Sequence, residues 1–193
     1  GDNYPSRPSD QGFQESLIHL AGGIGQVGDF TNYYAGNESY FDPALWHNNE
    51  IKKYEGYCSD IFTDEALKFI EQNKSNQFFC YLSFNAPHTP LQVPEKYYDL
   101  YKDIDPSNFY EEVTSEMTER DVNDAKKIYG MVTNIDENFG KLLYKLEELD
   151  IKENTIVIFL TDNGPQQTRY VSNLRGLKSQ VYNGGIKVPL YLS

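Results

Sequence analysis

The chain has 193 residues and a net charge of −12, and 39% of its residues are hydrophobic and 15% aromatic. This size and apolar content predict one globular domain with a real core rather than a disordered chain. The negative charge disfavours nucleic acid or an anionic membrane as a partner, because both bind basic surfaces. No stretch approaches the roughly 20 apolar residues of a membrane span. The sequence has neither an initiator Met nor a signal segment at its start, and residues 1–10 resemble a loop from within a protein, so we expect an excerpt of a longer protein.

Residues 1–57 are rich in Gly, Asn and Tyr, and we expect them to form an irregular region within the domain. We interpret residues 22–25 as a flexible turn, because they lack the G-x-G-x-x-G spacing and the strand-to-helix context of a nucleotide-binding loop. The aromatic residues here either stack on a sugar or aryl group or pack in the core, and their large area favours packing. They are Tyr33, Tyr34, Tyr40, Phe41 and Trp46.

The middle of the chain predicts a helix followed by a strand. Residues 59–73 place apolar side chains near helical spacing. A continuous apolar run at residues 78–84 predicts a buried strand, which Pro87 and Pro90 bring to an end. A short helix is expected over residues 95–101.

The strongest helix is predicted over residues 118–149, where apolar residues recur in steps of four and three. Thr118 and Asp121 resemble a capping box at its start. Gly130 and Gly140 each weaken the helix by about 1 kcal/mol relative to Ala. We therefore expect the apolar stripe of this helix to be held by burial against a sheet.

Two further strands are predicted, over residues 155–161 and 188–192. The run 78–84, the long helix and the run 155–161 follow one another as strand, helix and strand. This order predicts parallel strands joined by a right-handed crossover. The predicted fold class is therefore α/β, with a mostly parallel sheet flanked by helices.

The two cysteines, Cys58 and Cys80, permit a disulfide without implying one. Cys80 lies in a predicted strand and is interpreted as a small buried apolar residue. Nothing near Cys58 in the sequence would lower the pKa of its thiol, so we do not predict a nucleophile there. His19 and His47 have no supporting context and are interpreted as structural.

The residues directly after the predicted strand 155–161 are candidates for metal binding, because ligands bind beyond the carboxyl ends of strands in α/β sheets. Asp162 and Asn163 offer two hard oxygen donors, which suit Ca²⁺ or Mg²⁺. Gly164 allows the backbone to turn sharply behind them. The alternative interpretation is a plain Asp-Asn-Gly turn, since these residue types are common in turns.

His88 and Lys178 are candidates for binding an anionic ester. His88, in a proline-bracketed loop, would donate to an anionic oxygen or protonate a leaving group. Lys178 has several glycines nearby, which suggest a backbone bent close to something, and its ammonium would neutralise a bound sulfuryl or phosphoryl group. The alternatives are a structural histidine and a solvated lysine. Arg175 and Lys187 are weaker candidates for the task of Lys178.

Three stretches together resemble the sulfatase family, of the arylsulfatase type in the alkaline-phosphatase superfamily. They are residues 78–90, residues 129–140 leading on to 154–164, and residues 175–178 with 183–189. The resemblance implies an alkaline-phosphatase-like fold, with residues 1–193 as the C-terminal portion of one sulfatase catalytic domain. Asp136 matches a family position in the long helix, where helix packing is an equally good interpretation.

The resemblance also implies a site. Asp162 and Asn163 match two ligands of a bound Ca²⁺, with Mg²⁺ as the alternative metal. His88 matches a histidine at the sulfate or its leaving oxygen, and Lys178 matches a lysine that binds the sulfate. In the last motif, Asn183 stands where the family usually has Glu.

The family hydrolyses sulfate esters with a formylglycine made from the Cys or Ser of a Cys/Ser-x-Pro-x-Arg motif. Neither Cys58 nor Cys80 lies in such a motif. We therefore expect the nucleophile upstream of this chain, and we expect the excerpt alone to be inactive. The resemblance suggests a periplasmic or secreted protein whose substrate is a sulfated small molecule or glycan. Self-association of the excerpt is expected, because an unpaired strand edge invites it.

Two alternatives remain open at this point. One is a phosphodiesterase or phosphonate hydrolase of the same superfamily, which would share the metal and much of the sheet. The other is a non-catalytic binding protein that kept a sulfatase-like fold and lost the nucleophile, because a fold alone does not fix a function.

Overall fold

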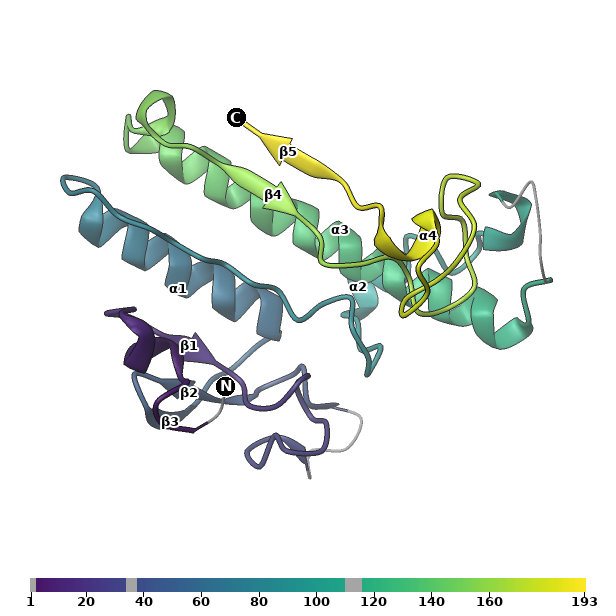
Figure 1. The fold of residues 1–193 in the computed structure, drawn as a ribbon, viewed down its shortest axis with the longest axis horizontal. Coiled ribbons are helices and arrows are strands. Elements are labelled where there is room, and N and C mark those ends of the chain that lie inside the picture. The colour runs from purple at the N-terminus through teal and green to yellow at the C-terminus, as the bar shows by residue number, and fades with distance from the viewer. Residues whose placement is uncertain (1–2, 34–37, 110–115) are drawn as a thin grey trace.

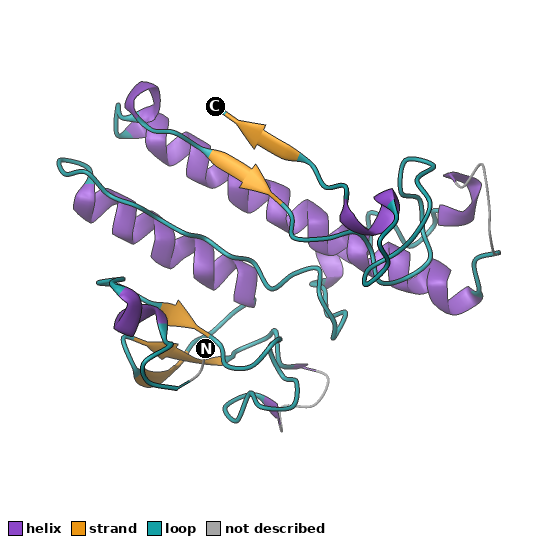
Figure 2. Cartoon of the chain, in the orientation of Figure 1, coloured by secondary structure: helices purple, strands orange, loops and turns teal. Residues whose placement is uncertain are grey.

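The computed structural model describes residues 3–33, 38–109 and 116–193. Two helices, α1 (Cys58–Asn73) and α3 (Glu119–Glu148), lie side by side at its centre (Figure 1). A small N-terminal sheet lies on the far side of α1 from α3, and a two-stranded ladder runs along α3. Short helices and loops complete the molecule (Figure 2). Within the described residues, no helix is long and apolar enough to cross a membrane.

The N-terminal region contains an antiparallel sheet of three strands, β1 (Leu17–Ile18), β2 (Ala44–His47) and β3 (Glu50–Lys53). The β2–β3 hairpin turns at Asn48 and Asn49, whose φ angles are 50° and 70°. Asparagine tolerates positive φ, and such two-residue turns match the twist of a hairpin. This sheet corrects in part the expectation that residues 1–57 are irregular.

The predicted helix at 59–73 is confirmed as α1, which begins one residue earlier. Its buried face contributes to a core that also takes residues from the N-terminal region, the loop after residue 84 and α3. The aromatic residues of the N-terminal region serve this core in part. Tyr40 is fully buried, Phe41 packs against the core and Tyr33 is exposed, whereas Tyr34 lies outside the described residues.

Helix α3 begins at the predicted capping box. The Thr118 hydroxyl accepts from the Asp121 amide at 3.2 Å, and the Asp121 carboxylate accepts from the Thr118 amide at 2.9 Å. The predicted stripe is buried at Ile128 and Leu146, whereas Val132 is 47% exposed. Asp136 is also exposed, so helix packing does not explain it within this chain.

The expectation that the stripe of α3 packs against a sheet is met only in part, because α3 packs on α1 and on α2 (Glu95–Tyr98) as well as along the two-stranded ladder. A Cβ on Gly130 would lie 2.9 Å from Val93 Cγ2 and 3.1 Å from the Tyr97 carbonyl oxygen. Glycine at this position therefore allows α2 to approach α3 closely. The rings of Phe139 and Phe159 join α3 to the ladder, with 5.2 Å between the ring centres.

The predicted parallel sheet is not formed by the described residues. Strands β4 (Ile158–Leu160) and β5 (Leu190–Leu192) pair with each other, and they do so antiparallel. The predicted strand 78–84 is an extended segment without a partner strand among the described residues. Its side chains alternate as in a strand, since Phe79 and Tyr81 are 72% and 71% exposed between half-buried neighbours. The segment runs in the same direction as β4 (Figure 1).

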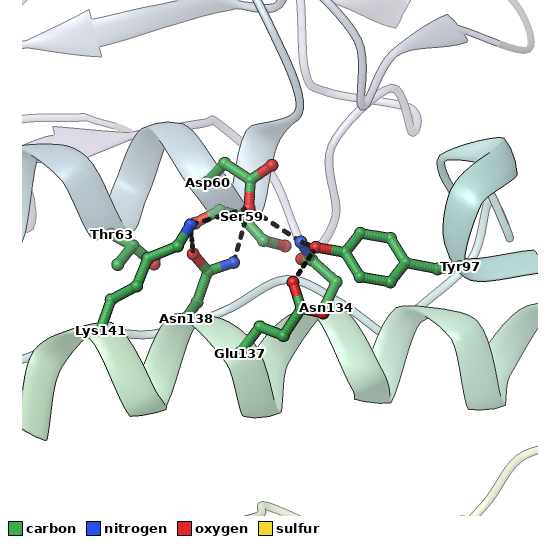
Figure 3. Close-up of polar contacts among 8 residues, drawn as sticks. All are labelled: Ser59, Asp60, Thr63, Tyr97, Asn134, Glu137, Asn138 and Lys141. Atoms are coloured by element: carbon green, nitrogen blue, oxygen red, sulfur yellow. Dashed lines mark hydrogen bonds and ion pairs between the residues drawn. The ribbon is translucent and has the colours of Figure 1, made fainter. Parts of the chain in front are cut away.

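A polar cluster joins α1 to α3 and α2 (Figure 3). Asp60 Oδ1 accepts from Asn134 Nδ2 at 2.8 Å and from Asn138 Nδ2 at 2.7 Å. Both asparagines are fully buried, and the Lys141 ammonium lies 4.0 Å from the same carboxylate oxygen. Tyr97 accepts from Asn134 and donates to a carboxylate on α3. These bonds fix the relative position of the helices that support the loops described next.

In the described part of the chain, three 3₁₀ helices and a further short α-helix complete the regular structure. The α-helix is α4 (Asn183–Ile186). The 3₁₀ helices are Pro8–Gln11, Pro106–Phe109 and Lys152–Asn154.

Candidate functional site

The turn after β4 carries the candidate metal ligands. Asp162 is exposed, and its Oδ1 accepts from the Asn163 backbone N–H at 2.8 Å. The Asn163 Nδ2 donates to the Gly164 carbonyl at 2.8 Å. These bonds leave Asp162 Oδ2 and Asn163 Oδ1 without a hydrogen-bond partner in the described part of the chain. Two oxygens of the type that hard cations prefer are thus free at this turn.

The turn is packed against two other segments by glycines. The Gly164 N–H donates to the Gly185 carbonyl at 2.9 Å, and a Cβ on Gly164 would lie only 1.8 Å from the Gly184 carbonyl oxygen. The Lys178 N–H donates to the Pro165 carbonyl at 2.7 Å. The predicted metal turn and the predicted lysine loop are therefore joined by backbone hydrogen bonds.

Helix α4 completes this unit from the other side. The Gly184 N–H donates to the Arg175 carbonyl at 2.7 Å, and a Cβ on Gly184 would lie 2.2 Å from the Gly176 carbonyl oxygen. We call residues 162–165 and 175–186 together the glycine unit. The glycines near Lys178 in the sequence suggested a close approach of the backbone to another group, and in the structure that group is the backbone of the glycine unit itself.

Three cations lie in or beside the glycine unit. The Arg175 guanidinium stacks on the Tyr182 ring, with 3.9 Å to the ring centre. Lys187 is exposed at the end of α4. The Lys178 side chain is half-buried and has no hydrogen bond or ion pair with the residues that the structure describes. Of the three cations, Lys178 combines a backbone that is hydrogen-bonded within the glycine unit with a side chain that is free to bind an anion.

His88 lies in the loop that follows the extended segment 78–84. Its N–H donates to the Asn85 carbonyl at 3.0 Å, and its carbonyl accepts from the Tyr40 hydroxyl at 2.8 Å. Gln92, at the end of the loop, accepts from the Tyr40 N–H through Oε1 at 2.8 Å. Burial raises the pKa of Tyr40, so its hydroxyl stays a donor. The loop that carries His88 is therefore clamped to the N-terminal region.

Gln26 also contacts the His88 loop, and sequence reasoning did not single it out. Its side-chain amide lies within hydrogen-bond distance of His88 and of Thr89. The local sequence showed only a glycine-rich turn, and the partners are more than sixty residues away. No pattern within one segment reveals such a contact.

The structure brings Asp162, Asn163 and Lys178 together through the backbone, but no described contact joins them to His88. The extended segment 78–84 and β4 both run toward the end of the molecule where α2 lies (Figure 1). The loop of His88 and the glycine unit therefore follow two segments that end on the same side of the molecule. No cluster of three or more His, Cys, Asp or Glu that would hold a metal occurs among the described residues.

The two cysteines and the other two histidines have contacts that fit structural roles. Cys58 and Cys80 are both free thiols, and burial raises the pKa of each, which is the opposite of an activated nucleophile. His19 contacts the Leu20 carbonyl, and His47 contacts the Tyr54 hydroxyl at 2.6 Å. The structural interpretation of these two histidines agrees with their contacts.

Comparison with known proteins decides the family. A sequence model described as Sulfatase matches residues 7–192. The chain belongs to the sulfatase family. This confirms the resemblance that the three sequence stretches indicated.

Sulfatases of known sequence and structure cover this chain. The uncharacterized sulfatase YdeN of Escherichia coli (strain K12) is 29% identical over 173 residues, which are 84% of this chain and 28% of that protein. An arylsulfatase of Clostridium perfringens (strain 13 / Type A) is 27% identical over 180 residues, 81% of this chain and 37% of that protein. The chain thus spans well under half the length of these relatives.

A solved structure supports the fold. The crystal structure of Ps i-CgsB in complex with k-i-k-neocarrahexaose matches with a TM-score of 0.78 and 28% identity, over 100% of this chain and 42% of that one. The chain therefore has the fold of part of a sulfatase, even though the strands among its described residues pair in small antiparallel sheets.

Proposed function

We propose that this chain forms one wall of the active site of a longer sulfatase polypeptide that hydrolyses a sulfate ester. The observation that carries the proposal is the glycine unit, in which the Asp162–Asn163 turn and the Lys178 loop are bonded through the backbone. Residue types that suit a cation and a sulfate group thus occur in one unit. Membership in the sulfatase family supports this assignment.

Asp162 and Asn163 would hold the metal. Their free carboxylate and amide oxygens fit a hard cation such as Ca²⁺, with Mg²⁺ as the alternative. Ca²⁺ takes roughly 6 to 8 oxygen ligands, so these two residues would supply only part of its coordination shell. When bound, the metal would supply positive charge to the sulfuryl oxygens. The remaining ligands would come from another part of the polypeptide.

Lys178 and His88 would act on the ester itself. The ammonium of Lys178, a half-buried residue, would neutralise charge on the sulfuryl oxygens as that charge develops. His88 would donate a proton to the oxygen of the departing alcohol while the sulfur–oxygen bond breaks. Its clamped loop would keep the ring in place during this step.

The nucleophile would lie outside these 193 residues, as the formylglycine of the motif that the sequence lacks. We therefore propose that the 193-residue chain alone does not turn over substrate. A sulfated glycan is the proposed substrate class, because the family acts on sulfate esters and the matched Ps i-CgsB structure is a complex with k-i-k-neocarrahexaose. A periplasmic or secreted location is proposed from the family resemblance alone.

The proposal is tested with Asp162→Ala in the longer polypeptide. We expect this variant to lose both bound metal, measured by mass spectrometry of the native protein, and hydrolysis of an aryl sulfate. The matched control is Glu153→Ala, which removes an exposed carboxylate from the short 3₁₀ helix that precedes β4. Normal metal content and activity in Asp162→Ala would refute the assignment.

The same assay separates the proposed reaction from its closest alternative. Rates on an aryl sulfate and the corresponding aryl phosphate are compared for the unaltered protein. Preference for the phosphate would assign the chain to a phosphodiesterase or phosphonate hydrolase, and absence of turnover on both would assign it to a binding protein.

A further inference from the structure

The side chain of Gln26 reaches the loop of His88 across 62 positions of the sequence. Its Nε2 lies 2.9 Å from the Thr89 carbonyl oxygen and 3.3 Å from Thr89 Oγ1. It also lies 3.2 Å from His88 Nδ1. Because a carbonyl oxygen only accepts, the Gln26 atom that faces it must be the amide nitrogen.

The Thr89 carbonyl is shared between two donors. His88 Nδ1 lies 2.9 Å from the same oxygen to which Gln26 donates. A carbonyl oxygen has two lone pairs, so it accepts from the Gln26 amide and from an Nδ1–H at once. The shorter contact of Nδ1 is with the carbonyl rather than with Gln26, which assigns a proton to Nδ1. The other ring nitrogen, Nε2, is then the one available to a ligand.

We propose that Gln26 is a positioning residue for His88. By holding the Thr89 carbonyl, it fixes the His88 ring in the tautomer with the proton on Nδ1 and leaves Nε2 for the substrate. The chemical consequence rests on the proposed function, whereas the tautomer itself does not. In the reaction, the protonated ring would give the Nε2 proton to the departing oxygen and keep the Nδ1 proton on the Thr89 carbonyl.

The turn that carries Gln26 is built to hold it. The fully buried Asp29 accepts from the Gly25 N–H at 2.8 Å and from Asn32 Nδ2 at 3.0 Å. The Asp29 N–H donates to the Gln26 carbonyl at 2.9 Å. A Cβ on Gly23 would lie 2.8 Å from Gln26 Cδ, so glycine leaves room for the amide. The glycine-rich run that the sequence indicated as a flexible turn is thus tied down by a buried carboxylate.

The test is the protonation pattern of the His88 ring in the 193-residue chain, measured by long-range ¹H–¹⁵N NMR in dilute samples that sedimentation shows to be monomeric. The chain has 3 histidines, so His88→Gln assigns the signals by deletion. We expect neutral His88 to carry its proton on Nδ1. A proton found on Nε2 in the unaltered chain would overturn the proposal.

Two variants separate positioning from simple packing. Gln26→Ala should leave a mixture of the two His88 tautomers, while the signals of His19 and His47 stay in place. Gln26→Met keeps the length of the side chain but removes the donor to the Thr89 carbonyl, so it should leave the same mixture of tautomers. If Gln26→Ala does not fold, Gln26→Met decides alone, because a single Nδ1-protonated tautomer in that folded variant contradicts the proposal. An unchanged tautomer in a folded Gln26→Ala would contradict it as well.

Failure of this test and failure of the proposed function are distinguishable. The tautomer is read without substrate, metal or turnover. In the longer sulfatase polypeptide, Gln26→Ala should lower kcat for an aryl sulfate by about tenfold or more with little change in KM, because a misplaced proton donor affects the transition state more than substrate binding. Loss of the tautomer with an unchanged kcat would retain the positioning role and refute the catalytic role of His88.

Discussion

Asp60 on α1 accepts a hydrogen bond from Asn138 on α3, with 2.7 Å between Asp60 Oδ1 and Asn138 Nδ2 (Figure 3). The same oxygen accepts from Asn134. One carboxylate oxygen therefore satisfies amides from two successive turns of α3, both of them buried. This is the polar link between the two central helices, and it positions the helix that leads into β4 and the Asp162 turn.

Removal of this link should destabilise the chain. In Asp60→Ala, buried amide N–H groups of Asn134 and Asn138 lose their acceptor, at a cost of about 1–3 kcal/mol each. We expect a loss of about 2 kcal/mol or more in the free energy of unfolding, measured by urea denaturation. Asp60→Asn keeps an acceptor oxygen and should lose less. The control is Asp64→Ala, which removes an exposed carboxylate of the same helix and should change stability little.

The glycine unit predicts a sharp contrast between two glycines. A Cβ at Gly164 would collide with the Gly184 carbonyl, so Gly164→Ala must separate the Asp162 turn from α4. A Cβ at Gly140 meets nothing within 4 Å. Gly140→Ala should therefore be neutral or stabilise α3 by up to about 1 kcal/mol.

Hydrogen exchange followed by mass spectrometry is the measurement for this pair. Gly164→Ala should raise exchange at residues 162–165 and 175–186 while the helices α1 and α3 stay protected. Equal protection of the glycine unit in both variants would mean that the unit does not depend on the close approach at Gly164.

The sequence predicted the helices better than the sheets, and the reason lies in the range of the contacts. Thr118 and Asp121 are three residues apart, so the start of α3 is visible in the local pattern. The extended backbone of 78–84 was also predicted, but pairing needs a neighbouring strand, and none of the described residues supplies one. The predicted parallel pairing is therefore wrong for the described residues, although the sulfatase-like fold is confirmed.

The same contrast between local patterns and long-range contacts holds for the candidate site. The Asp162 turn and the Lys178 loop were recognisable from residue types beside a strand and among glycines, but their backbone bonds were not. Gln26 was missed because its contact with the His88 loop spans 62 positions. The β2–β3 hairpin was not predicted either, although its turn signal is local, since Asn48 and Asn49 are adjacent in the sequence.

Alkaline pH should unfold the chain through its buried tyrosines. Burial raises the pKa of Tyr57 above its ordinary value of 10.0, so the folded chain keeps this proton after the unfolded chain loses it. This contribution to stability is complete below pH 10 and is lost as pH rises further. Tyr40 acts in the same direction.

The measurement is the free energy of unfolding as a function of pH from neutral to strongly alkaline. Tyr57→Phe should lose about 1 kcal/mol at neutral pH, because the bond to the Gln92 carbonyl is gone, and should show a shallower decline above pH 10. Tyr144→Phe changes a 69% exposed residue and serves as the control. An identical alkaline decline in Tyr57→Phe and the unaltered chain would contradict the account.

Self-association of the 193-residue chain is expected along its unpaired extended segment. Phe79 and Tyr81 are exposed there, and the backbone has no partner strand among the described residues. Such edges pair with other chains, and lysine blocks the pairing. Sedimentation velocity should show a concentration-dependent oligomer that Tyr81→Lys removes. The control, Leu100→Lys, changes an exposed apolar residue elsewhere and should leave the oligomer in place.

Lys178 in the glycine unit is the proposed ligand of the sulfate group of the ester. The measurement is kcat/KM for an aryl sulfate in the longer sulfatase polypeptide, compared between Lys178→Ala and Lys187→Ala. We expect a loss of about 10²-fold or more for Lys178→Ala, the size expected when a charge-stabilising group is removed from an active site, and little change for the exposed Lys187. Equal activities of the two variants would contradict this role of Lys178.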